Sequence, residues 1–373
     1  MTKKILLVGG SSGGHAYPLL AVAKALRFEA KKNNINLELM FLGVSGFLDK
    51  VAQEGGIPFK RVMAGGLRRY FDPRIILDVI KIPISFIQAF WHLFWFMPDV
   101  IFCKGGYDSV APAIVGRIYF IPVYVHESDS MPGLANRIIA KLARAIFIGF
   151  RSAEKYFPKE KTIFVGNPVR SELLSGSKAE ALQFFNFSDG QRTILVLGGS
   201  QGAKQINEII INSLVSLAKD YQIIHQTGES QFGAVRKEVD RIITEGDQAY
   251  GSYVRKNYRG YPFLDTKTLA LAYALADCII SRAGAGSLFE IATLGKPSIV
   301  IPLAQATRGE QLSNAAEFSR FGGIIVEGEN MTPNIIMNQI QSALENSVEI
   351  SQKIKSFATP DAVSVIASAL LTQ

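Results

Sequence analysis

The sequence has 373 residues, more than one domain usually holds, so two domains of ordinary size are expected. Of these residues 48% are hydrophobic and 19% are charged, which excludes an intrinsically disordered chain and fits a well-buried globular enzyme. The formal net charge of +8 favours an anionic partner, such as a phosphate compound, nucleic acid or an anionic lipid surface, without choosing among them.

The cysteines and the hydropathy of the sequence indicate the cellular compartment of the protein. Cys103 and Cys278 each lie in a short apolar run, which predicts buried, reduced thiols and fits a cytosolic chain. The apolar run near the N-terminus stops at Gly9, too early for a secretory signal. The longest apolar stretch, residues 82–97, is interrupted by polar residues and falls short of the ~20 residues that span a bilayer, so no transmembrane helix is expected.

Apolar runs alternate with helical patterns in the first half of the chain, which is typical of a parallel sheet in an α/β domain. The first run, residues 3–8, precedes a loop rich in glycine and serine. A helix is expected next, over about residues 18–31, where apolar side chains recur at helical spacing. Later runs predict strands buried on both faces, at residues 37–43, 99–103, 121–126 and 145–150.

The same pattern restarts near residue 192. A strand, a glycine-rich loop and a helix over residues 205–218 follow one another again. The two glycine-rich loops, at residues 6–14 and 195–203, resemble each other, so we predict an α/β fold of two Rossmann-like, doubly wound domains facing across a cleft. The later strands of the second domain are expected at residues 221–226, 277–281 and 297–302.

We predict that the first domain covers residues 1–168 and the second covers residues 169–352. A C-terminal helix within about residues 353–373 is expected to pack back on the first domain. Its apolar pattern follows Thr359, the expected N-cap, and Pro360, which suits a first helical turn.

The glycine-rich loops are candidate anion sites. Glycines let the backbone approach a ligand closely, and the helix start offers N–H groups to a phosphate, although an ordinary glycine turn is the alternative for residues 9–15. The G-x-G-x-x-G spacing of a dinucleotide site is absent. In the second loop Ala203 and Gln205 depart from the Walker A pattern, which argues against an NTPase and leaves a diphosphate contact from the Ser200 hydroxyl.

Polar residues follow two further predicted strands. Residues 126–129 either belong to a site or cap the next helix. Ser287 and Glu290 either form a capping box or belong to a nucleotide site, with backbone N–H groups on phosphate and the carboxylate on ribose hydroxyls. The sequence has no Asp-x-Asp pair to hold a divalent cation, so helix N-termini and Arg170 are expected to neutralise a diphosphate.

Eight motifs follow one another along nearly the whole chain: GGSSGGH, LRRY, KGGY, HESDSMPGLANR, GNPVR, LGGSQGA, SRAGAGSLFE and RGEQLSNA. On these motifs the chain resembles the MurG family of bacterial transferases. Members move N-acetylglucosamine (GlcNAc) from UDP-GlcNAc to the N-acetylmuramoyl (MurNAc) unit of lipid I, which is undecaprenyl-pyrophosphoryl-MurNAc-pentapeptide, and so form lipid II for peptidoglycan. The resemblance implies a GT-B fold, inversion at the anomeric carbon, no cofactor and no essential metal.

The resemblance also implies roles for single residues. It makes His15 the candidate general base, with Glu127 and Asp129 as further candidate catalytic residues on the acceptor side. The implied substrate-binding residues are Ser12, Gly13, Gly14, Tyr107, Asp129, Arg170, Ser200, Leu264, Ala285, Gly286, Ser287, Leu288, Phe289, Glu290, Gln311 and Asn314.

Five of these positions have specific implied contacts with the donor. Arg170 and Ser200 match diphosphate-binding positions, the backbone of Leu264 matches the group that recognises uracil, and Glu290 matches the ribose ligand. Gln311 matches a glutamine that holds the sugar hydroxyls.

Three residues depart from the family pattern. Ser11 and Asp129 stand where many members have glycine and asparagine, and Glu310 stands where many have a second glutamine. These differences leave the sugar contacts open, and the carboxylate of Asp129 adds a second candidate base.

The polyprenyl tail of the implied acceptor requires a peripheral enzyme at the cytoplasmic face of the cell membrane. Aromatic residues at 86–97 could insert into lipid, but more than half of the residues in this stretch are expected to pack on the sheet. The better membrane candidates are basic residues interleaved with apolar ones, which attract an anionic inner-leaflet surface: Arg68, Arg69, Arg74, Ile75 and Lys81.

Three other functions fit the same pattern less well. A glycolipid-forming GT-B transferase would use diacylglycerol as acceptor, a UDP-GlcNAc 2-epimerase would work without lipid, and a binding module would hold UDP without turnover. The segment HESDSMPGLANR favours the MurG resemblance over all three, and no nucleic acid partner is expected.

Overall fold

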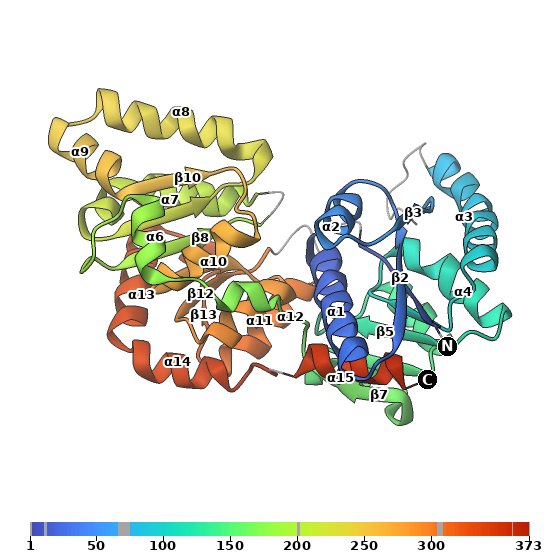
Figure 1. Ribbon diagram of the computed structural model, residues 1–373. Helices are drawn as coiled ribbons and strands as arrows, with labels where there is room; N and C mark the ends of the chain where they lie inside the picture. Colours follow the sequence, from blue (N-terminus) through green and yellow to red (C-terminus); the bar gives the residue numbers. More distant parts are fainter. Residues whose placement is uncertain are drawn as a thin grey trace. The chain divides into compact units, whose positions relative to one another are not determined.

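A computed structural model (Figure 1) describes residues 2–10, 13–65, 75–199, 202–303, 309–359 and 361–372, without the side chains of residues 75–79 and 329. The chain divides into two compact units, the first made of Met1–Val169 with Thr359–Gln373 and the second of Arg170–Ala358. Each unit holds one parallel sheet covered by helices, so the predicted α/β class with two Rossmann-like sheets is confirmed.

The first unit has seven parallel strands in the order β3-β2-β1-β4-β5-β6-β7. Every residue of β4 and β5 is buried, as expected for central strands covered on both faces. The sequence did not predict the two edge strands, because three residues of mixed polarity give no clear alternation. The strands are β1 (Thr2–Val8), β2 (Asn36–Gly43), β3 (Phe59–Arg61), β4 (Val100–Cys103), β5 (Val123–Glu127), β6 (Ala145–Ile148) and β7 (Thr162–Phe164).

Helices cover both faces of this sheet. One face carries α1 (Gly13–Lys32), α2 (Phe47–Gly55) and α15 (Ala362–Leu371), and the other carries α3 (Ile75–Phe96), α4 (Val110–Ile118) and α5 (Leu134–Leu142). The C-terminal helix α15 lies beside α1 (Figure 1), and its Ile366 and Leu370 are fully buried in the same core as Leu19. Both ends of the sequence therefore build one hydrophobic core.

Two helix starts differ from the prediction. Helix α1 begins at Gly13 rather than near Pro18. Pro18 is tolerated because its missing N–H removes a single hydrogen bond close to the helix start. Helix α15 begins after Asp361, and the buried Thr359 hydroxyl has no hydrogen-bond partner, so Thr359 is not its N-cap. Pro360 lies outside the described residues.

The second unit has six parallel strands in the order β10-β9-β8-β11-β12-β13. These strands are β8 (Thr193–Leu197), β9 (Gln222–Gln226), β10 (Tyr258–Tyr261), β11 (Cys278–Arg282), β12 (Ser298–Ile301) and β13 (Ile324–Ile325). The helices are α6 (Lys178–Phe185), α7 (Lys204–Asp220), α8 (Glu229–Glu245), α9 (Gln248–Asn257), α10 (Thr266–Leu275), α11 (Ala285–Leu294), α12 (Glu310–Ser319), α13 (Pro333–Glu345) and α14 (Ser347–Lys355).

Both cysteines are buried at central strands, Cys103 at the end of β4 and Cys278 at the start of β11. Neither forms a disulfide, so the prediction of buried, reduced thiols is confirmed.

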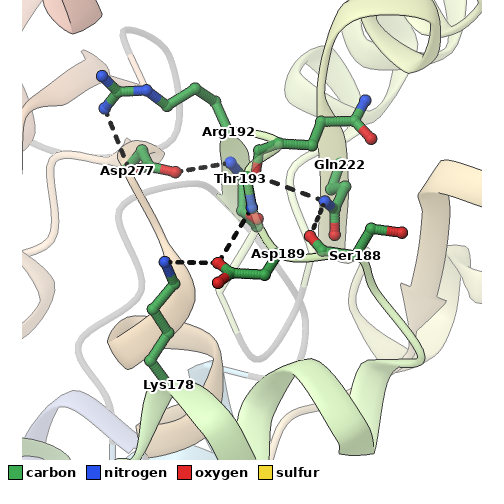
Figure 2. A network of polar contacts seen from close by, with 9 residues as sticks. Lys178, Ser188, Asp189, Arg192, Thr193, Gln222 and Asp277 are labelled. Atoms are coloured by element: carbon green, nitrogen blue, oxygen red, sulfur yellow. Dashed lines mark hydrogen bonds and ion pairs between the residues drawn. The ribbon is translucent and has the colours of Figure 1, made fainter.

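Polar contacts hold the amino-terminal edge of the second sheet (Figure 2). The Asp277 carboxylate, just before β11, accepts hydrogen bonds from the Thr193 N–H at 2.8 Å and from the Arg192 guanidinium at 3.2 Å. The Gln222 amide at the start of β9 donates to the Ser188 carbonyl at 2.7 Å. These contacts join the starts of three neighbouring strands, so this edge serves stability.

The strand order places the ligand sites at the other edge. In each sheet the first strand lies where the order reverses, with β1 between β2 and β4, and β8 between β9 and β11. Doubly wound sheets bind ligands beyond the carboxyl ends of the strands at this point. The loops after β1, β4, β8 and β11 are therefore the expected binding loops.

Candidate active site

The loops after β1 and β4 touch at the carboxyl edge of the first sheet. Gly9 has φ +115°, and a Cβ there would lie 2.7 Å from the Gly105 carbonyl oxygen, so only glycine fits this approach. Gly13 and Gly14 open α1 just after this contact, whereas Ser12 lies outside the described residues. The backbone is therefore kept close to whatever binds above these loops.

His15 lies in the first turn of α1, beside the end of β4. Its Nδ1 lies 3.3 Å from the Lys104 carbonyl oxygen, which only accepts, so Nδ1 carries the proton and Nε2 keeps its lone pair. Burial, reinforced by the positive charge of Lys104, lowers the His15 pKa to about 4. The imidazole is therefore neutral at pH 7, in the tautomer that lets Nε2 act as a base.

Glu127 ends β5 and is held by two hydrogen bonds. One carboxylate oxygen accepts the Asp129 N–H at 2.9 Å, and the other accepts the Asn136 side-chain amide at 2.8 Å. Burial, and then the negative charge of Asp129, raise the Glu127 pKa to about 7. Glu127 therefore organises this loop, and Asp129, which is less buried, is the more accessible of the two carboxylates.

Capping does not explain the polar segment 126–129. The next helix, α5, has Gly133 at its N-cap with no side-chain hydrogen bond, so that alternative is wrong. Tyr107 lies in a short 3-10 helix (Tyr107–Ser109) that follows β4 on the same edge. The structure thus gathers His15, Tyr107 and the segment 126–129 at the carboxyl edge of one sheet.

The sequence did not single out Lys104 as a site residue. Its side chain is fully buried, and its ammonium donates to His126 Nδ1 at 2.9 Å and to the Ser128 hydroxyl. His126 Nε2–H donates in turn to the Gly166 carbonyl at 2.8 Å, which fixes a neutral imidazole. A lysine directly after a buried strand is the signal that could have revealed it.

In the second unit Arg170 and Glu290 form a nearly buried ion pair at 2.9 Å, with 10% and 14% of their side chains exposed. Tyr273 donates to the other Glu290 oxygen at 3.0 Å, and Arg170 also donates to the Thr266 hydroxyl at 3.2 Å. Tyr273 lies in the apolar pattern of α10 and gave no sequence signal. Among the described residues, no group of three or more His, Cys, Asp and Glu side chains could hold a metal ion.

Helix α11 begins at Ala285, directly after β11, and has no side-chain cap. The capping-box alternative is therefore wrong, because the Glu290 carboxylate binds Arg170 and Tyr273 instead. Free N–H groups at this start suit an anion, and Gly286 and Ser287 lie in the first turn. Leu288 and Phe289 are core residues, so their side chains cannot contact a substrate.

Three other predicted donor contacts are already occupied by protein groups. The Leu264 N–H donates to the Gln226 side-chain oxygen at 3.1 Å. The Gln311 side-chain oxygen accepts the Leu303 N–H at 3.1 Å. The buried Asn314 amide donates to the Ala283 carbonyl at 3.2 Å, which positions the loop before α11. Ser200, in the loop after β8, lies outside the described residues.

Helix α3 presents a surface of exposed apolar side chains on the first unit. Trp91, Phe94 and Trp95 are between 57% and 66% exposed, and Ile87 is 69% exposed. Of the basic candidates, Arg68, Arg69 and Arg74 lie outside the described residues, as does the side chain of Ile75, and Lys81 is partly buried on α3. In the described part of the chain, no helix is both long and apolar enough to cross a membrane.

Comparison with known proteins identifies the class. Residues 5–148 match the glycosyltransferase family 28 N-terminal domain, and residues 193–367 match the family 28 C-terminal domain. A Bacillus cereus protein named UDP-N-acetylglucosamine–N-acetylmuramyl-(pentapeptide) pyrophosphoryl-undecaprenol N-acetylglucosamine transferase 2 is 35% identical over 98% of both chains. The MurG structure from Acinetobacter baumannii has a TM-score of 0.71 and 25% identity over both whole chains.

The two parallel sheets with their switch points match the GT-B fold of the MurG structure. The chain belongs to glycosyltransferase family 28, and its resemblance to the MurG enzymes is confirmed. A UDP-GlcNAc 2-epimerase structure from Neisseria meningitidis also covers both whole chains, with a TM-score of 0.67 but 16% identity, so it shares the fold alone.

The ion pair in the second unit gives a stability prediction. Replacing Glu290 with Gln (Glu290→Gln) should destabilise the second unit by about 3 kcal/mol, because it leaves the nearly buried Arg170 without its carboxylate. The measurement is urea unfolding followed by far-UV circular dichroism. Both tryptophans lie in α3 of the first unit. An unfolding transition that circular dichroism detects and tryptophan fluorescence does not is therefore assigned to the second unit.

The matched control is Glu238→Gln, which removes an exposed partner of Arg241 and should leave unfolding nearly unchanged. Equal effects of the two substitutions would contradict the assignment of the Arg170–Glu290 pair as a structural anchor.

Proposed function

We propose that this chain transfers GlcNAc from UDP-GlcNAc to the C4 hydroxyl of the MurNAc unit of lipid I, with inversion, and so forms lipid II in peptidoglycan synthesis. The observation that carries the proposal is the 35% identity over 98% of both chains with a relative named for this reaction. The neutral, oriented imidazole at the carboxyl edge of the first sheet supports it, because the reaction needs a base.

In the proposed reaction the acceptor C4 oxygen attacks the anomeric carbon of the donor sugar. His15 Nε2 takes the hydroxyl proton as the new C–O bond forms, and UDP leaves with the electron pair of the broken bond. Asp129 is the second candidate for the proton, and Tyr107 contacts the acceptor. General-base help of this kind contributes ~100- to 10,000-fold in rate.

The donor is proposed to bind the second unit, Arg170–Ala358. Arg170, Ser200 and the start of α11 would balance the charge on the diphosphate, without a metal ion. Glu290 would accept ribose hydroxyls with the lone pairs that Arg170 and Tyr273 leave unused. The Gln226 side-chain oxygen already accepts the Leu264 N–H. When uracil binds, Gln226 must therefore move away, or the Leu264 N–H must donate to uracil and to Gln226 at once.

The remaining donor contacts are assigned to the start of α12. Gln311 is proposed to hold the sugar hydroxyls, and Asn314 to act through the Ala283 loop. The first unit, Met1–Val169 with Thr359–Gln373, is proposed to bind the acceptor and the membrane.

The enzyme is proposed to work as a peripheral protein at the cytoplasmic face of the cell membrane. The exposed aromatic side chains of α3 support insertion into the interface, and Arg68, Arg69, Arg74 and Lys81 would attract anionic lipid. Five of the twelve side chains at 86–97 are exposed, and these are proposed to extend the membrane surface.

The test is transfer of labelled GlcNAc from UDP-GlcNAc to a water-soluble lipid I analogue with EDTA present. A labelled disaccharide product is expected. UDP-GlcNAc binding without transfer would overturn the proposed acceptor, and diacylglycerol acceptors and epimerisation would then be assayed in its place.

His15→Gln should lower kcat by about 100- to 10,000-fold, because the base is lost. It should leave the Kd for UDP unchanged, since UDP is proposed to bind the second unit. Steady-state kinetics and calorimetric titration measure the two quantities. His92→Gln, on α3, is the control and should keep wild-type kcat. Equal losses of turnover and UDP affinity in His15→Gln would refute the base assignment.

The double substitution Trp91→Ser, Trp95→Ser should weaken sedimentation with phosphatidylglycerol vesicles by at least about tenfold, because two amphipathic side chains leave the interface. Transfer to the water-soluble acceptor should not change. Tyr250→Ser, an exposed aromatic substitution in the second unit, is the control. Vesicle binding that is unaffected by the double substitution would remove α3 from the membrane surface.

A further inference from the structure

Lys104 contacts both the candidate base, His15, and the polar segment 126–129 at the end of β5. The carbonyl oxygen of Lys104 accepts the His15 Nδ1–H, while its ammonium donates to His126 and to Ser128. Lys104 can make both contacts because it directly follows β4, and β4 lies between β1 and β5 in the sheet. Its backbone faces the loop of α1, and its side chain reaches the end of β5.

The ammonium of Lys104 is fully buried, so it needs compensating charge. Its electrostatic partners are the carboxylates of Glu127 and Asp129. The mechanism described above gives Lys104 no role. The charged and titratable groups around it are His15 at the start of α1, His126 and Glu127 at the end of β5, and Asp129 just after β5, while Asp108 acts on the neighbouring Cys103.

We propose that Lys104 is a positioning residue for the transfer reaction: its backbone carbonyl orients the His15 imidazole, and its ammonium, a buried positive charge near that imidazole, fixes the 126–129 segment. His126 extends this arrangement. Its Nδ1 accepts a hydrogen bond from the Lys104 ammonium, and its Nε2–H donates to the Gly166 carbonyl. The kinetic part of this inference rests on the proposed function, whereas the electrostatic part does not.

The direction of the effect is the same for three titratable groups near Lys104. The positive charge of Lys104 lowers the pKa of His15 and of His126, and it also lowers the pKa of Glu127 against the larger upward effect of burial. Removing the charge therefore raises all three pKa values. A general base works only when deprotonated, so the acid limb of kcat/KM must move to higher pH when His15 is the base.

The first test needs no substrate. The chain has four histidines, and their ring pKa values can be measured by NMR titration of the wild type and of Lys104→Met. His15 and His126 should each rise by about one unit or more, since a charge in contact is removed. His225 is the internal control, because burial alone lowers its pKa, to about 3, in the other unit. Unchanged values for His15 and His126 would overturn the proposal.

The second test is the pH profile of kcat/KM with the water-soluble acceptor. In Lys104→Met the acid limb should move up by about one pH unit, and in Lys104→Arg, which keeps the charge, it should stay in place. Lys31→Met, at the exposed end of α1, is the control and should match the wild type. An acid limb that stays in place in Lys104→Met would show a purely structural role and refute the inference.

Lys104→Arg also covers the case in which Lys104→Met does not fold. Burial lowers the Lys104 pKa to about 8. Above that pH the ammonium loses its proton and holds the 126–129 segment less firmly, so kcat/KM of the wild type should fall. Arginine keeps its proton there, so this alkaline limb should vanish in Lys104→Arg, and its persistence would contradict the proposal. A wild type that shows no transfer would refute the proposed function, while the NMR titration would still decide the role of Lys104.

Discussion

The cost of burying charge shapes the carboxyl edge of both sheets. Lys104 is buried with Glu127 and Asp129 nearby, and Arg170 is nearly buried against Glu290. A lone ammonium or guanidinium would not be tolerated there, so each cation is stable only with its carboxylate partner and hydrogen bonds in place. These partners occupy the loops where doubly wound sheets bind ligands. The groups that make folding costly are thus the groups that can neutralise a phosphate or take up a proton.

The sequence predicted the central part of the fold because central parallel strands are apolar on both faces. Runs such as Val100–Cys103 and Cys278–Arg282 stand out for this reason, and the glycine-rich loops that follow mark the switch points. The edge strands β3 and β13 have two or three residues each and take their register from a neighbour. Their position depends on tertiary pairing, which no local pattern reveals.

The same distinction applies to the candidate site residues: local motifs reveal some of them, and only the fold reveals the others. His15 and Glu290, near the starts of the helices that follow the glycine-rich loops, were singled out from the sequence because such loops carry recognisable motifs. Tyr273 and Gln226 were not, because each looks like an ordinary member of its helix or strand until the fold brings it to Glu290 or to Leu264. The competing capping explanations also failed on tertiary grounds. Glu290 was available for a capping box by sequence spacing, but the ion pair with Arg170 binds it more strongly than a helix start would.

A histidine with a pKa near 4 is a weak base, and this bears on how the proton moves. The low pKa ensures that His15 is unprotonated at neutral pH, but it also reduces the driving force for taking a proton from a sugar hydroxyl. Such a base is useful only if the hydroxyl becomes acidic as its oxygen bonds to the anomeric carbon, so that proton transfer comes late. Burial, and then the positive charge of Lys104, set this low basicity of His15, so the same groups that keep the imidazole neutral also limit its strength as a base.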